Sequence, residues 1–338
     1  MCIMGFEKPV VMIHEVDTIV QQYRCEHVKK VVYAGGVPNV TFIVEFNSGA
    51  PIALRIGNLG YTRKDHLEFE VAVLSYLEQA SFTWSPRLVP LLDGSGFIGN
   101  WEKFPVIATR VIPGVTGDKV TVTTQLCFEI GKAVGEMRYN LAKYNGFVPS
   151  DEDFWSRSER LLNELEDFSV HQSWNITPSI VIDAYEIAKE SVQTTTYFNE
   201  VVHSDVWPPN IMVLGGHLSG ILDFDDLAVG PGILDIAAAI GEFGFDRKSD
   251  VLLKQNVSAI IHGFNKILEP ITCETVMIIL PLIEASYCSW LACNALHRVP
   301  FAESEIYYRR LNQLRSLPKR EHLEKNLVRI IASAIKDM

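Results

Sequence analysis

The alternation of hydrophobic and polar positions divides the chain into a first part made of short strands and a second part made of helices. In the first part, apolar residues recur at every second position over short runs bounded by turn-forming residues, which is typical of half-buried strands. Strands are predicted over residues 28–33, 40–46, 51–56, 87–92 and 104–111. Helical spacing predicts helices over residues 16–23 and 65–79, and the polar segment 93–103 is predicted to be a turn.

After residue 110 the apolar positions recur every three or four residues, which predicts amphipathic helices. Two short apolar runs, 211–214 and 219–222, flank Gly215 and Gly216, whose access to positive φ favours a β-hairpin. This distribution predicts an α+β fold with a small β-rich N-terminal lobe and a larger, mainly helical C-terminal lobe. The helices of the second lobe are expected over residues 124–144, 151–166, 178–193, 233–243, 250–267, 274–297, 303–314 and 320–336.

The hairpin brings oxygen-bearing side chains together. If its strands pair about the glycine turn, Asn210 lies opposite Asp223, and Asp205 stands in the loop just before them. Mg²⁺ prefers oxygen ligands and often takes one or two from protein, with the rest from phosphates and water. Asn210 and Asp223 are therefore candidate Mg²⁺ ligands, and Asp205 is a candidate to orient an attacking hydroxyl and accept its proton.

A single Asp or Asn in a loop more often faces solvent or caps a turn. The combination carries more weight, because a loop Asp, an Asn five residues later and a further Asp are the recurring parts of kinase-type phosphoryl transfer. Only residues 225–232 separate Asp223 from the next predicted helix, and no Ala-Pro-Glu follows. Such a short segment leaves no platform for a peptide, so the acceptor is expected to be a small molecule.

The motifs of this region resemble those of the aminoglycoside phosphotransferase and choline kinase superfamily, which includes type II homoserine kinases and hydroxylysine kinase. The family usually has Gly or Asn at the position of Ser204. The resemblance implies a bilobal protein-kinase-like fold that uses ATP and Mg²⁺, without distinguishing ATP from GTP. It rests on His203-Ser204-Asp205 with Asn210, on Ile221-Leu222-Asp223-Phe224 and on Asp235-Ile236-Ala237.

The first lobe contains a candidate phosphate-binding turn. Gly35 and Gly36 follow the first predicted strand, and glycines there let backbone N–H groups approach phosphates. A Gly-Gly pair alone is common in hairpin turns. The turn resembles the family's Gly-x-x-Asn loop, with Gly36 and Asn39 in place, which implies that these residues cover the nucleotide phosphates.

The resemblance also implies a charged pair in the first lobe. Arg55 lies on the third predicted strand, where kinases place a Lys against the nucleotide phosphates, and Arg can bind phosphate oxygens in bidentate fashion. Glu70 falls where the family's helix places the Glu that pairs with this base, with Glu68 as the alternative. A Glu on a helix is otherwise usually solvated.

The link between the lobes is predicted to follow the last strand of the first lobe. Residues 107–110 would form a hinge whose backbone meets the adenine edge, with Thr109 as the candidate contact. The boundary is placed near Thr109, so the chain is divided into residues 1–109 and 110–338.

Composition and charge narrow the classes of function. The formal net charge is -11 and the pI about 5.3, which argues against nucleic acid or an anionic membrane as a partner. The apolar segment 276–296 contains Pro281, Glu284 and Asn294, so it is expected to be a buried helix rather than a membrane span. None of the six cysteines forms a Cys-x-x-Cys pair, and no signal-peptide pattern is present, so a cytoplasmic location is expected.

These observations predict an enzyme that moves the terminal phosphoryl group of ATP to a hydroxyl of a small molecule, such as an amino alcohol like homoserine or an aminoglycoside-type antibiotic. The alternative is a non-catalytic nucleotide- or metabolite-binding pseudokinase. Asp225, Asp226 and the acidic segment 151–167 are candidates to meet an amino group on the acceptor, and His203 is expected to be structural. The identity of the acceptor and the oligomeric state stay open.

Overall fold

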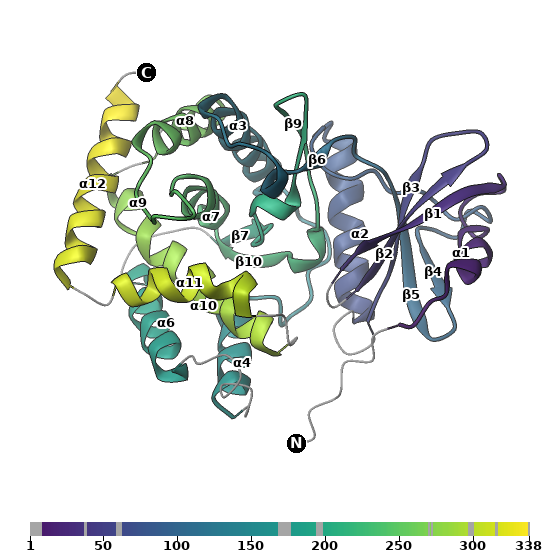
Figure 1. Cartoon of the computed structure of the whole chain (residues 1–338), viewed down its shortest axis with the longest axis horizontal. Coiled ribbons are helices and arrows are strands. Elements are labelled where there is room, and N and C mark those ends of the chain that lie inside the picture. The colour runs from purple at the N-terminus through teal and green to yellow at the C-terminus, as the bar shows by residue number, and fades with distance from the viewer. Residues whose placement is uncertain are drawn as a thin grey trace. The chain divides into compact units, whose positions relative to one another are not determined.

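A computed structural model of the chain describes residues 9–36, 39–58, 63–167, 177–193, 199–269, 271, 273–296, 301–314 and 317–336. Its contacts divide the chain into two compact units. The first unit ends at Pro113, just beyond the boundary predicted near Thr109, and also includes Gly146–Pro149. The second unit contains Gly114–Asn145 and Ser150–Met338. The predicted α+β fold is confirmed, because an antiparallel sheet precedes a mostly helical part (Figure 1).

The first unit is built on an antiparallel sheet with the strand order β1-β2-β3-β5-β4. Side chains alternate between buried and half-buried along β2 and β3, as the period-two sequence pattern predicts. Two helices, α1 (Ile13–Val20) and α2 (Lys64–Gln79), complete the unit. The strands are β1 (Val28–Gly35), β2 (Val40–Phe46), β3 (Ile52–Ile56), β4 (Ile98–Trp101) and β5 (Phe104–Arg110).

The prediction of a strand over residues 87–92 is wrong. This segment meets β5 only through a bridge between Leu88 and Thr109, with the Val89 amide 2.8 Å from the Ala108 carbonyl. Pro86 and Pro90 have no N–H to donate, so they interrupt a longer ladder. The edge strand is instead β4, which lies inside the segment predicted to be a turn.

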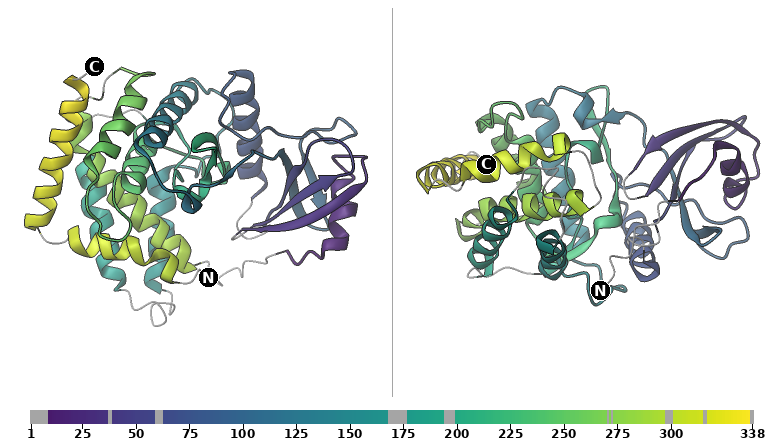
Figure 2. Two further views of the ribbon diagram at one scale, coloured as in Figure 1. Left: turned by 45° about the horizontal axis from the view of Figure 1, so that its top comes forward. Right: turned by 60° about the horizontal axis from the view of Figure 1, so that its bottom comes forward.

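The second unit is mainly helical, and α12, yellow in Figures 1 and 2, lies at its rim. Helices α3 and α8 cross at very short range, because a Cβ built on Gly131 would lie 2.0 Å from the Ile260 carbonyl oxygen, and one on Gly263 equally close to that of Phe128. The helices are α3 (Thr124–Leu141), α4 (Phe154–Asp167), α6 (Pro178–Gln193), α7 (Leu234–Phe243), α8 (Lys254–Asn265), α9 (Cys273–Met277), α10 (Ile279–Leu296), α11 (Phe301–Leu314) and α12 (Leu317–Lys336).

The helix predicted over residues 274–297 is broken into α9 and α10. Pro281 explains the break, because its ring clashes with the carbonyl of Met277 and it lacks the N–H that would bond there. The stretch Thr275–Ala295 is long and apolar enough to cross a membrane, but 83% of its most apolar window is buried. Since α10 packs against α4, α6, α7 and α11, it is the buried core helix expected from the sequence.

Short strands in the second unit hold the loops that carry the candidate chemistry. β6 pairs with β8, which pairs with β9, and β7 pairs with β10. The catalytic-loop candidate therefore leaves β7 and the segment after Asp223 returns along β10. The strands are β6 (Val115–Thr116), β7 (Asn199–Val202), β8 (Ile211–Leu214), β9 (His217–Ile221) and β10 (Ala228–Pro231).

A buried ion pair joins α10 to α12 and predicts a pH dependence of stability. Glu284, 1% exposed, accepts a hydrogen bond from Arg320, yet burial raises the pKa of Glu284 from 4.5 to about 7. The folded protein therefore binds this proton more tightly than the unfolded chain. Its contribution to stability is complete below pH 4.5 and is lost as the pH rises through 7.

We expect Glu284→Gln to flatten this dependence. The free energy of unfolding that the native protein loses between pH 4.5 and pH 8 should shrink in the variant by up to about 3 kcal/mol. Urea unfolding at both pH values measures it. Glu321→Gln, an exposed change on α12, is the control, and an identical pH dependence in the native protein and Glu284→Gln would contradict the expectation.

Candidate active site

The hairpin of the second unit is present, with its register one residue away from the prediction. β9 begins at His217, so Gly215 and Gly216 form a two-residue turn, and a bulge follows Met212. Ile211 therefore pairs with Ile221, and the Leu222 amide lies 2.7 Å from the Asn210 carbonyl. Asn210 is opposite Leu222, and Asp223 comes one residue later, at the same end of the hairpin.

The backbone is strained on both sides of this end. Asp223 has φ 63° and Ser204 has φ 62°, in the left-handed region that non-glycine residues seldom occupy. At Asp223 the chain leaves the strand direction and enters a short 3₁₀ helix, Phe224–Asp226. Strain of this kind costs on the order of 1–3 kcal/mol and tends to cluster at functional sites. The two turns fix the loops that carry Asp205 and Asp223.

Asn210 holds the carboxylate of Asp205. Its Nδ2 donates to Asp205 Oδ2 at 2.7 Å and to the Asp205 carbonyl at 3.1 Å. Because the amide nitrogen donates to Asp205, the amide oxygen Oδ1 can serve as an acceptor, and a cation is a suitable partner for it. The predicted catalytic and metal residues, Asp205 and Asn210, are thus brought into direct contact.

His203 joins the loop of Asp205 to the end of β9. Its Nε2 lies 2.9 Å from the Leu222 carbonyl, and the Asp205 amide lies 3.2 Å from its Nδ1. A carbonyl only accepts and an amide N–H only donates, so the ring is neutral with its proton on Nε2. Burial lowers the pKa of His203, which agrees with a neutral ring. The expected structural role fits these contacts.

Asp235, at the start of α7, anchors the same loop through its carboxylate. Its Oδ2 accepts the His203 amide at 2.9 Å and its Oδ1 accepts the Ser204 amide at 2.8 Å. Asp235 is 3% exposed, and burial raises its pKa, while the hydrogen bonds from the two backbone N–H groups oppose the rise. The Asp235 carboxylate thereby satisfies two buried backbone N–H groups.

We expect Asp235→Asn to destabilise the protein by about 2 kcal/mol and to reduce turnover. An amide presents one oxygen and one NH₂ group, so it would leave one buried backbone N–H facing another donor. The urea midpoint measures the loss. Asp246→Asn is the matched control, because Asp246 also accepts backbone N–H groups, from Lys248 and Ser249, but in a position open to water. Equal losses in both variants would contradict the expectation.

The sequence reasoning missed Arg157. It lies on α4, in the segment predicted to present carboxylates, yet its guanidinium turns inward and donates to Ser204 Oγ at 2.8 Å and to the Asp226 carbonyl at 2.9 Å. Ser204 Oγ itself donates to the Asp226 carbonyl. The signal was available, because Arg157 follows Phe154 by three residues and so lies on the apolar face of the helix.

The loop region carries an excess of negative charge. Burial, and after it the charges of Asp226 and Asp225, raise the pKa of Asp205 well above its ordinary value. Asn210 and Arg157 oppose this rise without cancelling it. Within the described ranges, no three His, Cys, Asp or Glu side chains gather closely enough to hold a metal ion. One amide and one carboxylate, Asn210 and Asp223, are nevertheless the donor types that suit Mg²⁺ bound mainly by phosphates and water.

In the first unit, the glycine turn is closed by Asn39. Gly35 and Gly36 have φ 103° and 115°, and a Cβ on Gly36 would lie 2.7 Å from the Asn39 carbonyl oxygen, so only glycine fits there. Asn39 is 5% exposed, and its Oδ1 accepts the Asn58 amide at 3.0 Å. Asn39 therefore ties the turn to the end of β3, and its contact with a nucleotide stays a prediction.

The charged pair expected in the first unit is formed by Arg55 and Glu70. Arg55 donates to Glu70 on α2, and both side chains are largely buried. The alternative, Glu68, instead pairs with Lys64 on the exposed face. Thr109 is paired with Ala53 of β3, and its role against adenine stays a prediction.

The sequence profile of the phosphotransferase enzyme family, abbreviated APH, matches residues 31–259, well over half of the chain. The chain belongs to this family. It is therefore a small-molecule phosphotransferase acting on a hydroxyl acceptor, as the sequence motifs predicted.

Two curated relatives of this phosphotransferase share about a quarter of its residues. Hydroxylysine kinase from Bos taurus is 24% identical over 280 residues, which covers 75% of this chain and 72% of the relative. Homoserine kinase from Sinorhizobium fredii is 24% identical over 265 residues, covering 74% and 73%. At this identity the relatives do not determine the acceptor of this phosphotransferase.

Solved structures share the fold of this phosphotransferase. The microcompartment-associated aminopropanol kinase has a TM-score of 0.73 at 14% identity, covering 94% of this chain and 100% of that one. The amicoumacin kinase hAmiN, in complex with AMP-PNP, Ca²⁺ and Ami, has a TM-score of 0.70 at 15% identity, covering 89% and 92%. The predicted kinase-like fold of this family is confirmed.

Proposed function

We propose that this phosphotransferase moves the terminal phosphoryl group of ATP to the hydroxyl of a small amino alcohol. The observation that carries the proposal is the Asp205 carboxylate, held by Asn210 at 2.7 Å beside the carboxylates of Asp225 and Asp226. Asp205 orients the acceptor hydroxyl and takes its proton as the phosphoryl group is transferred. His203 and Asp235 keep the Asp205 loop in place during this step.

Each remaining predicted residue has a role on the nucleotide side. Asn210 and Asp223 hold Mg²⁺, which neutralises phosphate charge when it is bound. Arg55, oriented by Glu70, pairs with the nucleotide phosphates, and Gly35 and Gly36 expose backbone N–H groups to them. The amicoumacin kinase structure contains AMP-PNP, an analogue of ATP, which supports ATP as the donor. The remaining predicted contacts are Asn39, beside the glycine turn, and Thr109, near the adenine.

The negative charge around Asp205 favours an acceptor with a cationic group. After burial, the charges of Asp226 and Asp225 are the main causes that raise the pKa of Asp205, and an ammonium group beside these carboxylates would neutralise that charge. Asp225, 7% exposed, and Asp226 are the groups best placed for such a contact. The names of the relatives agree, because hydroxylysine, homoserine and aminopropanol each combine an amine with a hydroxyl.

The deciding experiment is an ADP-release assay with Mg·ATP and, separately, Mg·GTP over a panel of hydroxyl compounds. The panel pairs 1-amino-2-propanol with 2-butanol, homoserine with 4-hydroxybutyrate, and hydroxylysine with its N-acetylated forms, and it adds choline and an aminoglycoside. We expect kcat/KM at least about tenfold higher for the amine-bearing member of a pair. Equal rates within each pair would contradict the amine contact, and nucleotide binding without turnover on any acceptor would favour a pseudokinase.

We place the enzyme in the cytoplasm. The cysteines with described side chains are free thiols, and Cys127 and Cys288 among them are buried, which fits a reducing compartment. Thiol titration of the freshly prepared protein, with and without denaturant, tests whether these thiols are free in the cell.

A further inference from the structure

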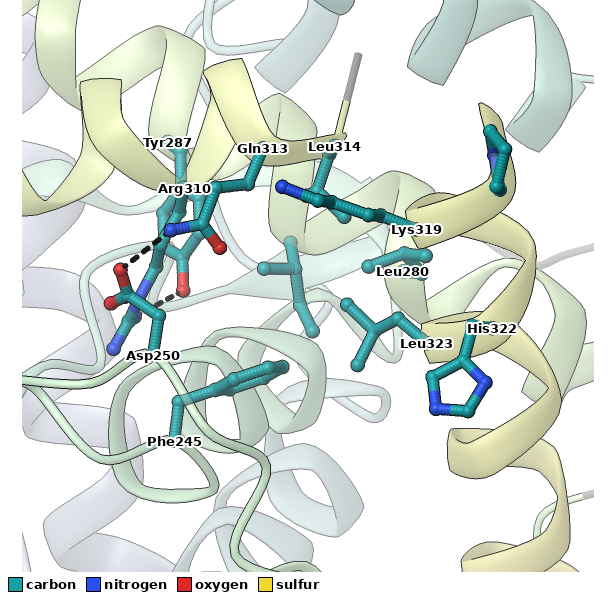
Figure 3. Close-up of a pocket in the computed structure, with 12 residues that line it drawn as sticks. Phe245, Asp250, Leu280, Tyr287, Arg310, Gln313, Leu314, Lys319, His322 and Leu323 are labelled. Atoms are coloured by element: carbon teal, nitrogen blue, oxygen red, sulfur yellow. Dashed lines mark hydrogen bonds and ion pairs between the residues drawn. The ribbon is translucent and has the colours of Figure 1, made fainter. Parts of the chain in front are cut away.

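The second unit contains a cavity that does not include the phosphotransfer loop. It has a volume of about 480 Å³ and lies between α10, α11, α12 and the segment that follows α7 (Figure 3). Pockets that hold small molecules usually measure about 300–1,000 Å³, so this one can accommodate a ligand. Neither Asp205, Asn210 nor Asp223 lines it.

The body of the cavity is apolar. Figure 3 shows the side chains of Phe245, Leu280 and Leu323 turned toward its middle, each from a different element. Leu280 and Ile283 are each 2% exposed, so the side of the cavity formed by α10 is apolar and buried. Such a surface favours an aliphatic or aromatic group over a polar one.

At one end of the cavity lies a cluster of charged side chains, of which Asp250, Glu242 and Arg310 are buried. Asp250 accepts hydrogen bonds from Arg310 at 3.0 Å and from Arg309 at 2.6 Å. Burial by itself would raise the pKa of Asp250, but these two guanidinium groups hold it below its ordinary value, so the carboxylate is ionised and its charge is shared between them. Two further carboxylates meet these cations. Glu242 is bonded to Arg247 at 2.9 Å and lies 4.0 Å from Arg310, and the charge of Glu305 acts on Arg309.

Lys319 adds a further positive charge at the mouth of the cavity. Its side chain is exposed and extends from α12 toward Gln313 in Figure 3. Within the part of the chain that the structure describes, Lys319 has no ion-pair partner. Arg247, Arg309 and Arg310 are balanced by Asp250, Glu242 and Glu305, so the ammonium group of Lys319 is the charge that an added anion would neutralise.

We propose that this cavity binds an amphipathic carboxylate, with its aliphatic or aromatic body against Phe245, Ile283 and Leu323 and its anionic group paired with Lys319. Such a ligand would act as an effector rather than as a substrate, because it occupies a place separate from Asp205. The proposal concerns a second site and does not depend on which acceptor the enzyme uses.

Helix α7 connects this cavity to the phosphotransfer loop. At its C-terminal end the Gly241 carbonyl accepts hydrogen bonds from Tyr287 and from Arg310, each at 2.9 Å, and both of these residues line the cavity. At its N-terminal end Asp235 holds the amides of His203 and Ser204. A ten-residue helix spans about 15 Å. A ligand that contacts Tyr287 or Arg310 would thus be linked through a single helix, α7, to the loop of Asp205.

The test is isothermal titration calorimetry of the full chain with octanoate, and with octanamide as the neutral probe of matched shape, in the absence of nucleotide and acceptor. We expect saturable binding of octanoate with a negative heat-capacity change, and binding of octanamide about fivefold weaker. Because no catalytic step is measured, failure of the proposed phosphotransfer would leave this result unaffected.

Three variants separate the elements of the proposal. Lys319→Gln should weaken octanoate about fivefold and leave octanamide unchanged, whereas Lys325→Gln, an exposed change on the same helix, should alter neither. Leu323→Trp should fill the cavity and abolish binding of both probes. Absence of saturable octanoate binding, or equal binding by the native protein and Lys319→Gln, would overturn the proposal; the latter comparison does not require the tryptophan variant to fold.

Discussion

Asp205→Asn is expected to lower phosphotransfer turnover by at least about a hundredfold while nucleotide affinity stays within about threefold. General-base catalysis by a positioned side chain typically supplies a factor of 10² to 10⁴, and an amide cannot accept the acceptor's proton. The Asn210 contact at 2.7 Å can be kept by the new amide oxygen, so the loop should hold its shape. Steady-state kinetics with the best acceptor and calorimetry with a nucleotide analogue measure the two effects.

The same variant should fold at least as stably as the native protein. Burial, and after it the charges of Asp226 and Asp225, raise the pKa of Asp205, so removing its charge relieves both the desolvation cost and the repulsion. Thermal unfolding tests this expectation, and Asp246→Asn on the exposed surface is the control. A variant with native turnover would remove Asp205 from the mechanism, and one that is strongly destabilised would show that its carboxylate is structural instead.

Asp223→Asn is expected to weaken binding of Mg·ATP by at least about a hundredfold and to reduce turnover in proportion. A ligand to the metal should matter at least as much as an outer-shell contact, which commonly contributes 10- to 100-fold. Asp223 is exposed in the structure, so the substitution removes little packing, and Asn tolerates the φ of 63° that Asp223 has. Calorimetry with and without Mg²⁺ separates metal-dependent from metal-independent binding.

Metal-free nucleotide provides the internal control for Asp223→Asn. Its affinity should be the same for the native protein and the variant, because the loss concerns the metal alone. A variant whose Mg²⁺ requirement and Mg·ATP affinity both match those of the native protein would exclude Asp223 as a ligand. A loss of metal-free nucleotide binding would indicate that the whole loop has moved.

Local pattern predicted most of the elements, and its errors have specific causes. The period-two alternation in β2 and the helical spacing in α2 were sufficient to predict these two elements, because each of them buries one face. Pro86, Pro90 and Pro281 account for the misplaced strand and the divided helix. The hairpin register differs by one residue because β9 begins at His217, two residues before the predicted strand, and the β-bulge after Met212 recovers only one of the two.

The candidate residues Asp205, Asn210 and Asp223 were accessible from spacing, because a single short loop and hairpin hold them. The position of Arg157 on the apolar face of α4 could be read from the sequence, but its partners could not, because Ser204 and Asp226 lie far along the chain. The cavity beside Lys319 could not be predicted from the sequence either, because its walls come from separate helices that are brought together only by packing.

The sequence by itself indicated the fold class and the phosphotransferase chemistry, through its hydrophobic pattern and the spacing of Asp205, Asn210 and Asp223. The Arg55–Glu70 pair was implied only by the resemblance to the family, which left Glu68 as an alternative. The tertiary structure decided which groups hold the Asp205 loop, where surplus charge accumulates and where a second cavity opens. The physical reason is that burial and long-range contacts set hydrogen-bond partners and pKa values, and neither can be read from neighbours along the chain.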